Sequence, residues 1–220
     1  MTALPRDADP FTIIGQGSRE LGLILDDTAI GKMVRHLKLL REWQSRINLT
    51  AITRVRDMAI RHFLDSLTVF KLIPVGRCLR VLDSGTGAGF PGVVLQTADD
   101  TLQVTLMDRD PRKIIFLKHV ARELELEGLR FLNAPLSALL EEPSAFGFDL
   151  LVSRAFSSDP LLLDRLSLVL ERTGSLIRMT GPASLSEDLV LRNFRQTGVW
   201  EGTLPFSSRF RRVVQYSRVP

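Results

Sequence analysis

The chain has 220 residues, 45% of them hydrophobic, and a formal net charge of +4 at pH 7, which suits one α/β domain with a modest extension. Its single cysteine, Cys78, excludes an intrachain disulfide and a multi-cysteine zinc site, and favours the cytoplasm. No apolar stretch is long enough to span a bilayer, so we expect no membrane partner.

The first third of the chain predicts an arm followed by helices. Residues 1–17 contain two prolines and two glycines, which predict a flexible N-terminal arm. Apolar residues recur at three- and four-residue spacing from Met33 to Ile47, which predicts a helix over about 28–47. A second helix is predicted over about 56–72, ending before Pro74. Residues 18–75 therefore form a predicted helical extension.

After Gly76, short apolar runs alternate with helical segments, the pattern of βαβ units around a parallel sheet. Strands are predicted at 79–83, 104–108, 129–133, 148–153 and 175–180. Helices are predicted at 91–98, 112–124, 136–142 and 161–171. Two further strands, at 199–204 and 211–217, would close the sheet, the last one antiparallel. Residues 76–220 are thus predicted to form one α/β unit, a mainly parallel seven-stranded sheet flanked by helices.

A glycine-rich turn follows the first predicted strand. Gly85, Gly87 and Gly89 let the backbone turn tightly and approach a ligand, and the next helix offers its free N–H groups. Asp108 ends the following strand about twenty residues later, the spacing expected for a carboxylate that accepts ribose hydroxyls. The pattern predicts a nucleoside cofactor over the carboxyl ends of the strands.

The glycines alone do not choose between a nicotinamide cofactor and S-adenosylmethionine. Asp83, at the mouth of the loop, is unfavourable beside a pyrophosphate but suits a ligand with an ammonium and a sulfonium group. We therefore favour S-adenosylmethionine and keep the nicotinamide alternative open.

Five segments together resemble one family, the bacterial small-subunit ribosomal RNA guanine-N7 methyltransferases, also called glucose-inhibited division protein B. The segments are 48–52, 61–67, 83–92, 112–117 and 153–156. The resemblance implies a Rossmann-like class I methyltransferase fold with an N-terminal helical extension and S-adenosylmethionine as cofactor. It also implies methyl transfer to N7 of one guanine in 16S rRNA, free or in the small ribosomal subunit. We expect a cytoplasmic monomer.

The chain departs from the family pattern at three places. Pro135, Leu136 and Ser137 stand where the family usually has Arg-Ala-Glu near the adenine. Thr180 stands in place of a lysine before Gly181, and Trp43-Gln44 replaces Trp-Asn. The second change removes a cation that could face RNA.

With the resemblance, the sequence predicts two sets of site residues. The predicted cofactor contacts are Asp83, Gly85, Gly87, Gly89, Phe90, Asp108, Leu136, Ser137 and Arg154. The predicted RNA contacts are Arg35, Lys38, Arg41, Arg61, Arg112, Lys113 and Arg211.

Arg154 is assigned to the rim between cofactor and substrate, with surface pairing to an acid as the alternative. No general base is expected, because guanine N7 carries a lone pair and no proton. His62 and Asp65 share a helical face and either orient substrate or satisfy each other in packing. His36 and His119 lack ligand partners at suitable spacing, so no metal is predicted.

Other functions stay open on the sequence alone. The same fold carries small-molecule methyltransferases and nicotinamide-dependent enzymes, and the departures at Ser137 and Thr180 also suit a non-catalytic RNA-binding relative.

Overall fold

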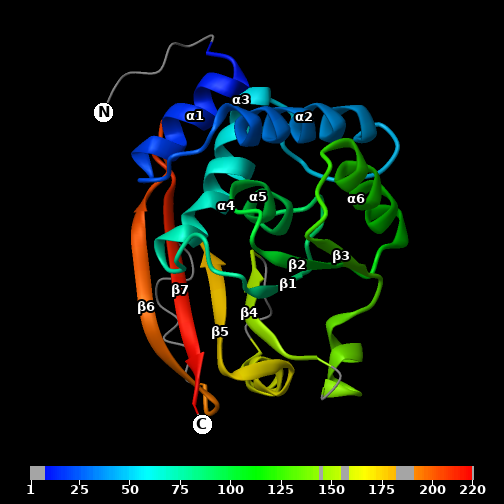
Figure 1. Cartoon of the computed structure of the whole chain (residues 1–220), viewed down its shortest axis with the longest axis vertical. Coiled ribbons are helices and arrows are strands. Elements are labelled where there is room, and N and C mark those ends of the chain that lie inside the picture. The colour runs from blue at the N-terminus through cyan, green and yellow to red at the C-terminus, as the bar shows by residue number, and fades with distance from the viewer. Residues whose placement is uncertain (1–7, 144–145, 155–158, 182–190, 220) are drawn as a thin grey trace.

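A computed structural model describes residues 8–143, 146–154, 159–181 and 191–219 (Figure 1). The helices are α1 (Pro10–Glu20), α2 (Asp27–Trp43), α3 (Val55–Met58), the π-helix η1 (Ala59–Leu64), α4 (Asp65–Leu67), η2 (Thr68–Lys71), α5 (Gly92–Ala98), α6 (Pro111–Glu123), η3 (Leu136–Leu140), α7 (Pro160–Arg165) and η5 (Leu166–Val169). The strands are β1 (Arg80–Ser84), β2 (Gln103–Met107), β3 (Leu129–Leu132), β4 (Phe148–Ser153), β5 (Leu170–Thr180), β6 (Phe194–Thr203) and β7 (Phe210–Arg218). Within these ranges every helix is too short or too polar to cross a bilayer.

The seven strands form one sheet in the order β3-β2-β1-β4-β5-β7-β6. Strands β1 to β5 pair in parallel, whereas β7 runs antiparallel to both β5 and β6. The predicted mainly parallel seven-stranded sheet is confirmed, including the antiparallel last strand. β1 and β4 are neighbours near the centre of the sheet, with β2 and β3 on one side and β5, β7 and β6 on the other. The strand order therefore reverses between β1 and β4, and the carboxyl ends of two such strands are the usual binding position for a ligand.

Two hydrophobic clusters cover the two faces of the sheet. One contains Val81, Val104 and Ile177 and continues into the helices of the N-terminal extension. The other contains Leu82 and Leu151 and is covered by η3, α7 and η5. Because neighbouring residues of a strand point to opposite faces, the central strands read as continuous apolar runs.

The predicted flexible arm is wrong for residues 10–17, which belong to helix α1; residues 1–7 lie outside the described part of the chain. Asp9 caps this helix by accepting hydrogen bonds from the backbone N–H groups of Phe11 and Thr12. Ile13 and Ile14 are fully buried. Gly17 lies against Leu64, at a distance that leaves no room for a Cβ atom. The glycines that suggested a loose arm therefore permit close helix packing instead.

The N-terminal extension packs into the same core as the sheet. In Figure 1, α1, α2 and α3 lie across one end of the molecule, above α4 and α5. Phe63 of η1 and Val93 of α5 are both fully buried in one cluster. The second predicted helix is present, but it changes from α to π geometry at Ala59 and to 3-10 geometry at Thr68. The first ends at Trp43, four residues before the predicted end at Ile47.

Candidate functional site

The glycine-rich loop after β1 has the tight, left-handed backbone turns that its glycines permit. Gly85, Gly87 and Gly89 have φ values of 71°, 59° and 96°, a region that residues with a Cβ rarely adopt. A Cβ on Gly89 would lie 2.5 Å from Val93, whereas a Cβ on Gly85 would meet nothing within 4 Å. Gly89 thus packs the loop onto α5, and Gly85 faces open space.

Asp83 holds this loop closed from inside. Its Oδ2 accepts hydrogen bonds from the Thr86 hydroxyl at 2.6 Å and from the Gly92 backbone N–H at 2.8 Å. The side chain is 1% exposed, and burial raises its pKa to about 6 against the opposing effect of these hydrogen bonds. The expectation that Asp83 lies at the mouth of the loop is wrong, because the next residue, Ser84, takes the face that points to the cavity.

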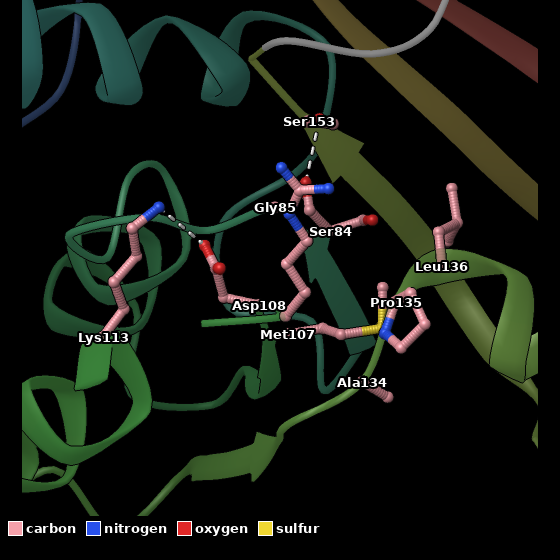
Figure 2. A pocket seen from close by; sticks show the side chains of 10 residues that line it. Ser84, Gly85, Met107, Asp108, Lys113, Ala134, Pro135, Leu136 and Ser153 are labelled. Atoms are coloured by element: carbon pink, nitrogen blue, oxygen red, sulfur yellow. Dashed lines mark hydrogen bonds and ion pairs between the residues drawn. The ribbon is translucent and has the colours of Figure 1, made fainter. Parts of the chain in front are cut away.

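A cavity of about 390 Å³ lies at the carboxyl ends of β1, β2 and β4, within the size range of small-ligand sites. Figure 2 shows its wall, with Met107 and Pro135 next to each other and Lys113 reaching toward Asp108. The lining residues are Ser84, Gly85, Met107, Asp108, Arg109, Lys113, Ala134, Pro135, Leu136 and Ser153. A hydrogen bond from the Ser153 hydroxyl to the Ser84 carbonyl, 2.9 Å long, joins β4 to β1 at its edge.

Asp108 follows β2 directly and links the wall of the cavity to the glycine loop. Its Oδ2 accepts a hydrogen bond from the Gly87 N–H at 3.0 Å and lies 3.4 Å from Lys113 Nζ. Its Oδ1 accepts from the Asp110 N–H at 3.0 Å, so the carboxylate is fixed in orientation. Lys113, which the sequence assigned to RNA, therefore belongs to the cavity.

The cavity suits S-adenosylmethionine in three respects. Gly85 leaves open space for a ligand beside the loop. Asp108 is an oriented carboxylate, which is the group that binds ribose hydroxyls. Met107 and Leu136 provide an apolar wall for an adenine ring.

Of the predicted cofactor contacts, the cavity wall contains Gly85, Asp108 and Leu136. Ser137 is exposed and is absent from that wall as far as the structure describes it. The sequence reasoning missed Ser84, Met107 and Ser153. The sequence feature that could have identified these three residues is their position at the ends of predicted strands.

Phe90 is enclosed between two histidines. Its ring centroid lies 4.6 Å from that of His62 and 5.0 Å from that of His36, with nearly parallel planes. Phe63 contacts its edge at 5.2 Å. His36 donates from Nε2 to the Ala88 carbonyl at 2.9 Å, and burial lowers its pKa to about 4. Phe90 therefore joins the loop to the N-terminal extension and is 5% exposed.

Arg154 connects the end of β4 to the same extension. Its guanidinium donates to the Arg61 carbonyl and to Asp65 Oδ2, both at 2.8 Å, and to His62 Nδ1 at 3.3 Å. His62 must then carry its proton on Nε2, which donates to the Thr50 hydroxyl at 2.8 Å. Burial, followed by the positive charge of Arg154, lowers the pKa of His62 to about 3. The alternative of an arginine paired with an acid matches the contact of Arg154 with Asp65. His62 and Asp65 do not bond each other as the other alternative expected; each contacts Arg154 instead. Ala155 and Phe156 of the same motif lie outside the described residues.

Two of the predicted RNA-binding arginines gather near Arg154. Arg211 of β7 donates to Asp65 Oδ1 at 2.7 Å, so Asp65 binds two arginines. Burial lowers the pKa of Arg61, and the positive charges of Arg209, Arg211 and Arg154 lower this pKa further, while Asp57 partly offsets the effect. The other three arginines therefore lie close enough to repel Arg61.

The other predicted RNA contacts lie apart from this cluster. Arg35 pairs with Glu123 at 2.6 Å, and Arg112 pairs with Asp110 at 2.8 Å. Lys38 and Arg41 are exposed on α2. The RNA-binding role of these residues stays a prediction.

The strand order, the glycine loop and the acid after β2 define a class I methyltransferase that uses S-adenosylmethionine. The chain belongs to the GidB family, whose model, described as rRNA small subunit methyltransferase G, matches residues 29–197. Family membership decides against the nicotinamide alternative.

Similar proteins agree with this family. A protein from Syntrophus aciditrophicus named ribosomal RNA small subunit methyltransferase G is 36% identical, and the match covers 80% of this chain and 74% of that protein. One of the same name from Clostridium botulinum is 31% identical, covering 81% and 75%. Among solved structures, MtNAS in complex with MTA and tNA has a TM-score of 0.59 at 15% identity, covering 96% and 86% of the two chains. TrmN from Thermus thermophilus has a TM-score of 0.53 at 17% identity, covering 73% and 53%, and like MtNAS shares the fold.

Proposed function

We propose that this chain transfers a methyl group from S-adenosylmethionine to N7 of a guanine in 16S rRNA. Family membership supports the reaction and the RNA. The observation that carries the proposal is a cavity that suits the methyl donor and whose lining residue Ser153 is followed directly by Arg154, one of two arginines that bind Asp65. Polyanionic RNA is the substrate that such a pair of arginines favours.

The reaction needs positioning more than proton transfer. When bound, S-adenosylmethionine supplies an electrophilic methyl group. Asp108 would accept the ribose hydroxyls, and Met107 with Leu136 would contact the adenine. Guanine N7 attacks through its lone pair and carries no proton, so a general base is unnecessary. Alignment of the two reactants and exclusion of water are then the main contributions of the protein.

In this proposal Arg154 orients the guanine. Its guanidinium lies 5.9 Å above the ring of Phe90, and its Nη1 is held by a long contact of 3.3 Å to His62. A fork of donors anchored on one side by Asp65 can present an N–H group to guanine O6 on the other. In this proposal His62 and Asp65 are positioning residues that act through Arg154.

The site of action follows from the proposed substrate. Ribosomal RNA is in the cytoplasm, and the proposal places the chain there as a monomer. Free 16S rRNA and the assembled small subunit are both to be offered as substrates in the test.

The test measures tritiated methyl transfer to small-subunit RNA from cells that lack the endogenous activity. We expect one methyl group per RNA, recovered as 7-methylguanine after nuclease digestion. RNA from cells that retain the activity is the matched control and should accept none. Absence of transfer by a chain that binds S-adenosylmethionine in calorimetry would contradict the proposal.

A further inference from the structure

Arg178 of β5 is buried without a partner. Its side chain is 7% exposed, which makes it the one arginine in the buried set of the described residues. Its Nε has no hydrogen-bond partner, and no ion pair joins it to any residue within the ranges that the structure covers. A mostly buried arginine that has no anionic partner suggests a ligand that supplies the missing anion.

The register of the sheet places Arg178 beside the cavity. Ser84 pairs with Met107 on β2, and Ser153 lies next to Ser84 and pairs with Arg178 on β5. Paired residues of neighbouring strands project from the same face, so these four side chains form one row across the carboxyl end of the sheet. The first three line the cavity. Arg178 is the next in the row, about 4.8 Å beyond Ser153, a distance that an extended arginine side chain can span.

The position of Arg178 points to the substrate rather than the cofactor. Asp108, the predicted ribose ligand, follows β2, and three strand spacings separate β2 from β5 in the order β2-β1-β4-β5. On the β5 side, Arg154 follows β4 and Arg211 lies on β7, but both point to the opposite face of the sheet from Arg178, because they share a face with Val152 and Val213 of the other hydrophobic cluster. Both of these arginines bind Asp65, whereas Arg178 has its charge available.

We infer that Arg178 binds a phosphate of the target RNA next to the methylated base, an inference that rests on the proposed function. The guanidinium fork suits the two oxygens of a phosphodiester. Thr180 lies two residues further along β5 and so on the same face as Arg178. A lysine introduced at position 180 would therefore lie on the same face of the sheet as Arg178.

The experiment compares Arg178→Met with Arg172→Met, a control on the exposed part of the same strand. RNA affinity is measured with 16S rRNA and S-adenosylhomocysteine, so the result does not depend on turnover. We expect Arg178→Met to weaken RNA binding about tenfold and to lower the slope of affinity against salt by about one. Thermal unfolding of this variant should not occur at a lower temperature, because the substitution removes no ion pair or hydrogen bond of the described residues. The control should change neither RNA affinity nor salt slope.

A second variant tests the position of the charge. Arg178→Met combined with Thr180→Lys should restore at least half of the lost affinity in logarithmic terms, because it returns a cation to the same face. Failure of this rescue would contradict the inference.

Other outcomes would also overturn the inference. Unchanged RNA affinity and salt slope in Arg178→Met would show that no phosphate binds there. A tenfold weaker affinity for S-adenosylhomocysteine with unchanged RNA binding would identify the cofactor carboxylate as the anion. Lower thermal stability would indicate a structural role. Loss of RNA affinity in a protein whose wild type transfers no methyl group would uphold the phosphate site and contradict the proposed function instead.

Discussion

Gly85 and Gly76 differ in function although their backbones are alike. Both have positive φ, 71° and 79°, and a Cβ on either would meet nothing within 4 Å. Only Gly85 lines the cavity of the glycine loop. Gly85→Val should therefore weaken S-adenosylhomocysteine binding at least tenfold, measured by calorimetry, because the side chain fills the space of the ligand. Gly76→Val is the matched control and should bind normally.

The pair separates occlusion from backbone strain. Each variant should lose about 1–2 kcal/mol of unfolding free energy, since each forces a branched residue into the left-handed region. If both bind the cofactor equally well, the cavity is not the cofactor site. If both lose binding, strain rather than occlusion explains the result.

Individual site residues were predictable from the sequence where spacing alone defines the role. The position of Asp108 next to the glycine loop was predictable because the residue ends a strand at a fixed distance from the glycines, and the structure joins it to Gly87. Its role as a ribose ligand stays a prediction. Asp83 was misplaced, because a sequence does not show which face of a strand a given residue takes. Arg178 was missed, because an arginine inside an apolar run gives no signal until the strand register is known.

Helix α1 shows how glycine can be misinterpreted at the level of an element. Gly17 faces Leu64 of η1, and a Cβ there would lie 2.3 Å from Leu64 Cδ1. Gly17→Ala should lose about 1–3 kcal/mol of unfolding free energy in urea titrations, since the helix must move away from its neighbour. Gly31→Ala on α2 is the control: its Cβ would meet nothing within 4 Å, and it should gain up to about 1 kcal/mol from helix propensity. Equal effects in the two variants would contradict the close packing of α1 on η1.

Most elements were predictable because buried parallel strands read as short continuous apolar runs, whereas amphipathic helices repeat apolar residues every three or four positions. The predicted strand at 148–153 matches β4 residue for residue. β5 begins at Leu170 rather than at 175, because η5 ends at Val169 and the chain enters the sheet at once. The π-helix η1 was not predictable, since the spacing of apolar residues indicates a helix but not the hydrogen-bond pattern within it.

For the molecule as a whole, three buried groups make stability depend on pH. The pKa values of His36 and His62 are lowered to about 4 and 3, and that of Asp83 is raised to about 6. As the pH falls below 6.5, the unfolded chain protonates its histidines while the folded chain does not, so stability decreases. Below pH 6 the folded chain protonates Asp83 before the unfolded chain does, so this group opposes the loss.

Between pH 6 and 4 the unfolded chain therefore binds two histidine protons more than the folded chain, and the folded chain binds one carboxyl proton more. The difference of one proton predicts a loss of about 1.4 kcal/mol of unfolding free energy per pH unit as the pH falls. Asp83→Asn keeps an oxygen that can accept from Thr86 and Gly92 but removes the opposing titration. Its slope should be about twice that of the wild type in urea titrations at a series of pH values. Comparing the two slopes cancels the contribution of surface carboxylates common to both proteins. Equal slopes would show that Asp83 titrates in the folded protein as it does in the unfolded chain.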